Sequence, residues 1–196
     1  MSAVQHRSVG VLAETADAAA SMGSTSPFPS SGEVAPLLRT HVAGTGRVLT
    51  RPRPGEEPAV DHIVVSSAGV DIVQVHQARG RIGIHHLGAS PYERALYVDG
   101  VDRTTWLTEL DATTAEVRDA LGRSPLARLR RGWLCIEGAD WREVPTGVRL
   151  AGYVVLPPSL LRQFLPVSGT FGTAHITVAA TRLEHHLDRT HRAVVA

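Results

Sequence analysis

The sequence predicts one α/β domain built around a single mixed sheet. Two β-branched runs, at 63–65 and 70–75, flank a short turn and predict a buried hairpin. An apolar stripe at helical spacing follows over 103–121, and further apolar strands and a second stripe lie beyond it. The chain has 196 residues, of which 43% are hydrophobic and 20% charged, as is usual for such a domain.

The N-terminal part predicts a disordered segment followed by a helix. Residues 1–30 are rich in Ala, Ser, Gly and Pro and carry too few large apolar side chains to offset their ordering entropy. A helix is expected over 31–42, with Pro36 in its first turn and Gly44 beyond its end. We then expect a short strand over 47–50 and a loop over 51–58, where three prolines remove ladder donors.

The hairpin over 60–77 organises the rest of the chain. Ser67-Ala68-Gly69 is turn chemistry, since Gly69 can adopt a positive φ. Side chains alternate along a strand, so Gln74 and His76 share one face, opposite Val73 and Val75. A third strand is expected over 79–85, turned back at Gly80, and a fourth over 96–98.

The second half predicts helices between further strands. Asp102 is expected to cap a helix over 103–121 that ends at Gly122. Its buried stripe is Leu107, Leu110, Thr114, Val117 and Leu121. Then follow a buried strand over 133–136, a turn over 138–141, a strand over 148–156, a helix to Phe164, a final helix over 176–187 and a tail over 189–196. The folded domain is therefore expected to span 31–188.

Charge and cysteine content limit the function classes. The net charge is +1, so binding to nucleic acid would need a local patch. Every basic residue except histidine is arginine, because the chain has no lysine. Its one cysteine, Cys135, lies in an apolar run, which indicates a buried thiol and a reducing, cytoplasmic location. No apolar run reaches the ~20 residues of a membrane span, so no membrane partner is expected.

Several short motifs, taken in order, resemble the nuclease-related domain family (NERD) of the restriction-endonuclease-like, PD-(D/E)xK fold group. They are Gly32-Glu33, residues 60–65, Ala68-Gly69-Val70, Gly80-Arg81-Ile82, Leu134-Cys135-Ile136, and residues 139–141 and 152–157. The resemblance covers about residues 32–188. It implies a restriction-endonuclease-like mixed sheet flanked by helices.

The resemblance implies metal-dependent phosphodiester cleavage by a helix glutamate, a strand aspartate and an acidic-x-Lys triplet around Mg²⁺ or Mn²⁺. Glu33 matches the glutamate and Asp61 the aspartate, and both would be metal ligands in an active enzyme. Gln74 stands where the second acid belongs, and His76 stands where the lysine belongs. An amide oxygen is a poorer Mg²⁺ ligand than a carboxylate, and Asp71 points to the opposite face. We therefore expect a degenerate, inactive domain without a cofactor, retained as a nucleic-acid-binding or interaction module.

Two alternatives remain open. The chain is an active divalent-metal-dependent nuclease if Glu33, Asp61 and His76 form a remodelled site with Mg²⁺ or Mn²⁺. The other is a purely structural or protein-interaction domain without nucleic-acid contact.

The densest basic patch is Arg123, Arg128, Arg130 and Arg131, and a second comprises Arg47, Arg51 and Arg53. Arginine suits the phosphates of DNA or RNA, although a solvated loop is the more common explanation of such a run. No aromatic residues interleave these arginines, which disfavours stacking on single strands. His85, His86, His185, His186 and His191 are expected to be solvated surface residues.

Overall fold

The computed structural model describes residue 32 and residues 34–53, 59–88, 93–128, 130–166 and 168–195. The segment expected to be disordered, 1–30, and the candidate ligand Glu33 lie outside these residues. The elements are α1 (Val34–His41), β1 (Gly46–Arg53), β2 (Ala59–Ser66), β3 (Gly69–His86), β4 (Arg94–Val98), β5 (Val101–Asp102), α2 (Thr105–Leu121), a 3-10 turn (Pro125–Arg128), β6 (Arg130–Asp140), β7 (Val148–Leu150), β8 (Tyr153–Leu156), α3 (Pro158–Phe164) and α4 (Thr173–Val195).

The strands of this part of the chain form one eight-stranded mixed sheet, in the order β1-β2-β3-β6-β8-β7. β4 pairs with the distal half of β3, and β5 pairs with β4. β1, β2 and β3 are antiparallel neighbours, whereas β3, β6 and β8 run parallel. Helix α2 lies in the crossover between the parallel strands β3 and β6. The predicted α/β class with a mixed sheet flanked by helices is therefore confirmed.

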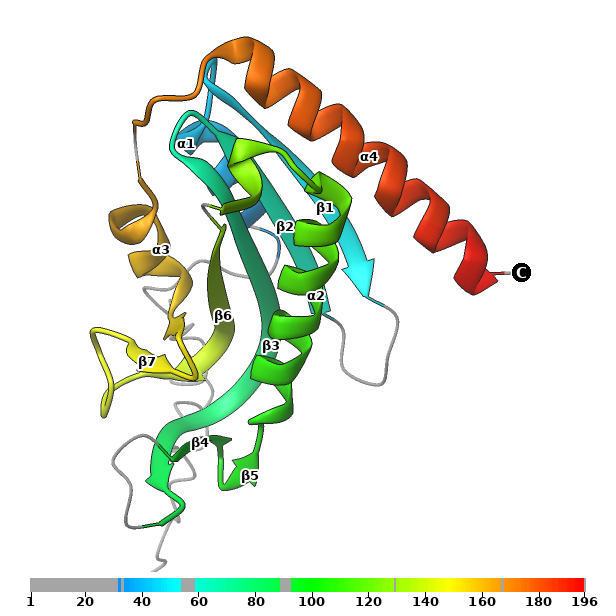
Figure 1. Ribbon diagram of the computed structural model, residues 1–196. Coiled ribbons are helices and arrows are strands. Elements are labelled where there is room, and N and C mark those ends of the chain that lie inside the picture. Colours follow the sequence, from blue (N-terminus) through cyan, green and yellow to red (C-terminus); the bar gives the residue numbers. More distant parts are fainter. Residues whose placement is uncertain are drawn as a thin grey trace, which may run out of the picture.

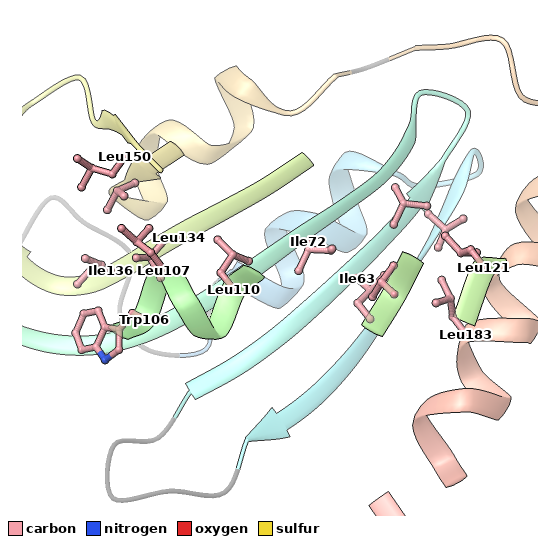
Figure 2. Packing of buried hydrophobic residues seen from close by; sticks show 14 of the residues in the cluster. Ile63, Ile72, Trp106, Leu107, Leu110, Leu121, Leu134, Ile136, Leu150 and Leu183 are labelled. Carbon is pink, nitrogen blue, oxygen red and sulfur yellow. The ribbon is translucent and has the colours of Figure 1, made fainter. Parts of the chain in front are cut away.

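Helices cover both faces of the sheet (Figure 1). α2 and α4 pack on one face and form the larger core with residues such as Ile63, Ile72 and Leu134 (Figure 2). α1 and α3 pack on the other face around Val64 and Cys135. Burial raises the pKa of the Cys135 thiol well above its usual range, as expected of a structural cysteine. None of the described helices has the length and apolar character needed to cross a membrane.

The central hairpin has the predicted turn and faces. Gly69 has φ +124 at the turn between β2 and β3, and Asp61 lies directly opposite Gln74. The predicted alternation also holds, since Val73 and Val75 lie in the core under α1 and α3. Asp61, Gln74 and His76 consequently face α2.

Gly80 bends the chain but does not turn it back, so the prediction of a separate third strand was wrong. β3 continues through Gly80 to His86 as one curved strand, and its register with β6 shifts between Gln77 and Gly80. Gly80 has φ +104, and a Cβ there would lie 2.3 Å from Cβ of Asp99. A β-bulge of this kind bends a strand without ending it.

Other boundaries also differ from the prediction, and the final helix α4 runs over Thr173–Val195 instead of 176–187. β1 extends through Pro52 to Arg53, because β1 is an edge strand, where a missing N–H is tolerated. β6 extends to Asp140, so no turn occurs over 138–141. The expected strand over 148–156 is a hairpin of β7 and β8, which turns at residues 151–152.

α2 has the predicted buried stripe with one correction. Thr113, not Thr114, is buried between Leu110 and Val117. Thr114 is half-buried, and its hydroxyl donates to the backbone carbonyl of Leu110 at 2.7 Å. The hydroxyl of Thr113 therefore lies against the sheet, directly over β2.

Candidate functional site

Three of the four residues singled out from the sequence meet on one face of the sheet. Asp61 on β2 and Gln74 on β3 are completely buried, and His76 is 2% exposed. All three lie beneath α2. Glu33 lies outside the described residues, and α1, which begins at the next residue, covers the opposite face of the sheet.

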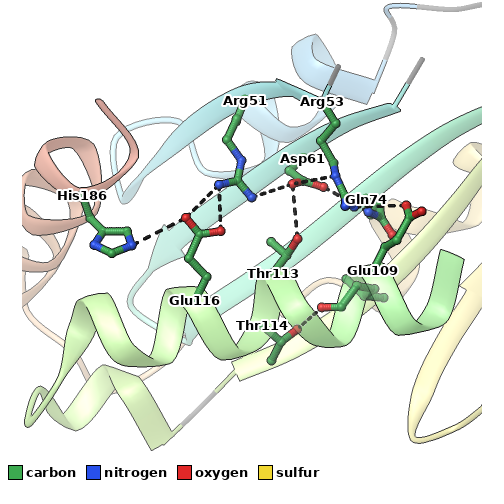
Figure 3. A network of polar contacts seen from close by, with 10 residues as sticks. Arg51, Arg53, Asp61, Gln74, Glu109, Thr113, Thr114, Glu116 and His186 are labelled. Atoms are coloured by element: carbon green, nitrogen blue, oxygen red, sulfur yellow. Dashed lines mark hydrogen bonds and ion pairs between the residues drawn. The ribbon is translucent and has the colours of Figure 1, made fainter. Parts of the chain in front are cut away.

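Asp61 is held by cationic side chains from the neighbouring strand β1 (Figure 3). Nη2 of Arg51 donates to Oδ2 of Asp61 at 3.0 Å, and Nε of Arg53 lies 3.9 Å from the same oxygen. The hydroxyl of Thr113 on α2 donates to it at 3.4 Å. The carboxylate therefore has charged and neutral partners from two elements.

Acidic residues of α2 hold the two arginines in place (Figure 3). Nη1 of Arg51 donates to both carboxylate oxygens of Glu116, at 2.9 and 2.8 Å. Nη1 of Arg53 lies 3.3 Å from Oε2 of Glu109. Burial lowers the pKa of Arg51, but hydrogen bonds and charge interactions with Glu116 and Asp61 raise it more, so its net pKa lies above the usual value. Arg51 is therefore a permanent cation at this position.

Gln74 also interacts with this network. In one orientation its amide nitrogen lies 3.3 Å from Oδ1 of Asp61. In the other, the amide oxygen accepts from Nη1 of Arg53, and the nitrogen donates to the carbonyl of Trp106 at 3.0 Å. We assign the second orientation, because it gives each amide atom a partner of the correct type. Gln74 then fixes Arg53 and offers no free oxygen.

His76 is a neutral, apolar-packed ring. It stacks on Trp106 with ring centroids 4.1 Å apart and an interplanar angle of 17°. Neither ring nitrogen has a hydrogen-bond partner among the described residues. Burial, and then the charges of Arg53 and Arg103, lower its pKa from 6.5 to about 4. His76 therefore carries no charge near pH 7 and cannot replace a lysine cation.

These residues do not fit the divalent cation that the resemblance implies. Mg²⁺ and Mn²⁺ take several oxygen ligands, chiefly carboxylates, whereas Asp61 is the only carboxylate among the three residues. The guanidinium groups of Arg51 and Arg53 already neutralise that carboxylate and would repel a second cation. In the described ranges, no group of three or more His, Cys, Asp and Glu side chains is arranged to hold a metal ion.

The other candidate residues lie elsewhere. Asp71 faces the α1–α3 side, as predicted, where Nε and Nη2 of Arg131 donate to its two oxygens at 2.8 and 3.0 Å. Nε1 of Trp133 donates to it at 2.9 Å. Arg131 is thus partly neutralised. Arg123 and Arg128 are exposed, as a nucleic-acid contact or a solvated loop both require, and the side chain of Arg130 lies outside the described set.

Sequence reasoning missed most of the partners that define this site. The three prolines over 51–58 predict a loop for Arg51 and Arg53, although the period-2 alternation of a strand places them on one face. Glu109, Thr113 and Glu116 recur at spacings of four and three along α2, which places them on one side of that helix. His186, expected to be solvated, is half-buried and lies 3.5 Å from Glu116. The sequence shows these spacings, but they predict contacts with Arg51, Arg53 and Asp61 only once α2 is known to lie over β1 and β2.

Comparison of the chain with protein-family models, with curated proteins and with solved structures found no match.

Proposed function

We propose that this chain is a catalytically inactive nuclease-related domain that works as a nucleic-acid-binding module. The observation that carries the proposal is the ion pair of Arg51 with the buried Asp61. Asp61 matches the family's metal-binding aspartate, and its negative charge is balanced by a side chain of the protein itself. Gln74 and His76, at the positions of the missing acid and lysine, support the same interpretation.

The energetics of the network support a permanent loss of metal binding. Asp61 has 0% and Arg51 19% relative exposure, so the pair is largely removed from water. Breaking a buried pair by removing one partner costs about 3–5 kcal/mol, because the other charge stays buried. A metal ion would have to displace Arg51 from both Asp61 and Glu116. Weak ligands such as Gln74 would not compensate for that loss.

Support for a retained nucleic-acid role comes from the surface. Arg123 and Arg128 are exposed, and neither forms an ion pair with a described carboxylate. Arginines of this kind bind phosphate with little dependence on sequence. The resemblance supplies the same substrate class, since a nuclease scaffold that has lost cleavage can still hold its former substrate.

A plasmid-nicking assay tests the loss of activity. The full chain is incubated with supercoiled DNA and with single-stranded DNA and RNA, in Mg²⁺ and in Mn²⁺, beside its Asp61→Asn variant. We expect no cleavage above the level of the variant. Metal-dependent cleavage that disappears in Asp61→Asn would instead establish the remodelled enzyme.

A further inference from the structure

Four arginines from separate parts of the chain lie around the C-terminal end of α2. Arg118, Arg123 and Arg128 belong to α2 or to the connection that follows it, and Arg182 belongs to α4. α4 packs beside the end of α2 (Figure 1), and Nη1 of Arg182 donates to the backbone carbonyl of Leu121 at 2.9 Å. Residues that are 61 positions apart in the sequence therefore contribute to one basic surface, the α2-end patch.

The connection between α2 and β6 is an ordered segment that holds two of these arginines in place. The N–H of Ser124 donates to the carbonyl of Leu121 at 3.1 Å, and Oγ of Ser124 accepts from the N–H of Leu126 at 3.3 Å. Leu126 is completely buried and anchors the 3-10 turn in the larger core. Arg123 and Arg128 are exposed on each side of this anchor. Arginines on an ordered connection lose less conformational entropy on binding than arginines on a mobile loop.

The α2-end patch contains little negative charge to balance its arginines. Asp119 is the only carboxylate that the sequence has between Arg118 and Arg128. Its Oδ1 lies 3.1 Å from Nε of Arg118, but both side chains are exposed, and exposed pairs of this kind are weak. No described carboxylate lies within ion-pair distance of Arg123, Arg128 or Arg182. Four guanidinium groups against one carboxylate favour a polyanionic ligand.

Arg182 stabilises the fold and also has donors available for a ligand. The carbonyls at the C-terminus of a helix carry partial negative charge, so a guanidinium beside Leu121 stabilises the end of α2. Nε and Nη2 of Arg182 bond to no described residue, and the residue is exposed. Arg123 and Arg128 have no such structural contact, so substitutions at these two positions test the patch without loosening α4.

The residue types of the α2-end patch favour a duplex over a single strand. Between Arg118 and Arg128 the sequence has no aromatic residue, so the patch lacks the rings on which single-stranded nucleic acids stack their bases. A double helix carries one negative charge per about 1.7 Å of its axis, and arginine binds its phosphates without reading the bases. Clustered guanidinium groups without aromatic neighbours fit that backbone.

We infer that the α2-end patch binds the phosphate backbone of double-stranded nucleic acid, without base specificity. The inference rests on the nucleic-acid role proposed above and names its surface and strand preference. It excludes Arg131, whose guanidinium is bound by Asp71 on the other face of the sheet. It does not depend on whether Asp61 binds metal.

Fluorescence anisotropy at several salt concentrations tests this surface. The full chain is titrated into a labelled DNA duplex and into one of its single strands. Four phosphate contacts predict that log affinity falls against log salt with a slope of about −3.6 for the duplex. Arg123→Gln combined with Arg128→Gln is expected to reduce the steepness of this slope by about 1.8, the value for two contacts, and to weaken binding to all duplex sequences alike.

Arg39→Gln combined with Arg162→Gln is the matched control. Both arginines are exposed, and they lie on α1 and α3, which cover the opposite face of the sheet. This control removes the same net charge and should leave the affinity and the slope nearly unchanged. Circular dichroism verifies that each variant is folded.

Each other outcome overturns a definite part of the account. If wild type binds but the Arg123 and Arg128 double variant has the same slope and affinity, the surface is wrong and the nucleic-acid role stands. An equal loss in the control would reduce the effect to net charge and would also overturn the surface. Tighter binding of the single strand than of the duplex would overturn the strand preference. No binding of wild type even at low salt would overturn the surface and the proposed function together.

Discussion

A buried aspartate such as Asp61 can either bind a metal ion or form an ion pair with arginine. A carboxylate at the centre of a sheet must be compensated, because an isolated buried charge is far too costly. A metal ion can provide the compensation, and so can a guanidinium group. Arg51 and Arg53 provide it here, and both are held by acids from α2. The identity of Asp61 alone therefore carries no information about metal binding.

His76 makes the stability of the domain depend on pH. Its pKa is about 4 in the folded chain against 6.5 ordinarily, so the unfolded chain binds a proton at higher pH than the folded one. The stabilisation is complete above pH 6.5 and is lost as the pH falls from 6.5 to about 4. For this residue the loss at pH 4 is on the order of 3 kcal/mol. Buried His62, whose pKa is also about 4, adds a loss of the same sign.

Urea unfolding of His76→Phe between pH 4 and 7 measures this contribution. The variant keeps a ring on Trp106 and removes two buried nitrogens without partners, so its free energy of unfolding at pH 7 should equal or exceed that of wild type. The acid-induced loss should become smaller. His86→Gln, at an exposed site, is the control for the removal of one imidazole ring. An unchanged profile in His76→Phe would mean that His76 already accepts a proton near pH 6.

The roles of Gln74 and His76 were only partly predictable from the sequence. Strand alternation placed both on one face of β3, because a period of two is a local property of the backbone. The partners came from β1 and α2, which are separated from Gln74 by long stretches of chain. Local periodicity does not state which helix covers which strand. The ion pairs of Asp61 could therefore not be predicted from the sequence, although the sequence contains each of the residues that form them.

At the scale of elements, glycine and proline were the main sources of error. Gly80 predicts a reversal of the chain, and the prolines from Pro52 onward predict the end of a strand, since both residue types usually interrupt regular structure. The bulge at Gly80 and the edge position of β1 accommodate them instead. Ala151 and Gly152, read as part of a strand, form a tight turn with φ values of +49° and +86°. The ends of α2 were predicted within two residues, whereas α4 extends well beyond the predicted 176–187.

Gly80→Ala tests the bend in β3. The substitution places a Cβ 2.3 Å from Cβ of Asp99 and imposes φ +104 on alanine, so we expect the free energy of unfolding to fall by about 1–3 kcal/mol. Gly172→Ala is the matched control, because a Cβ there meets no atom within 4 Å. It should change stability by less than about 0.5 kcal/mol. Similar effects of both variants in thermal unfolding would contradict the strained bend.

At the scale of the whole molecule, the fold separates two regions. The Asp61 network lies between β1, β2, β3 and α2, whereas the ion pair of Asp71 with Arg131 lies on the opposite face of the sheet. The α/β class could be predicted from the order of helices and strands, because the spacing of apolar residues along the sequence indicates each of them. The pairing of β3 with β6 brought Arg131 to Asp71, and no local pattern in the sequence indicates that contact.

Binding of Mn²⁺ by the full chain, measured by calorimetry, tests most directly whether arginine occupies the place of the metal. The account predicts no binding to wild type below about 1 mM. It predicts measurable binding once Arg51→Gln and Arg53→Gln are combined with Gln74→Glu and His76→Lys, because the cations are removed and the acid and lysine of the motif that the sequence resembles are introduced. Stoichiometric Mn²⁺ binding to wild type that Asp61→Asn abolishes would contradict it.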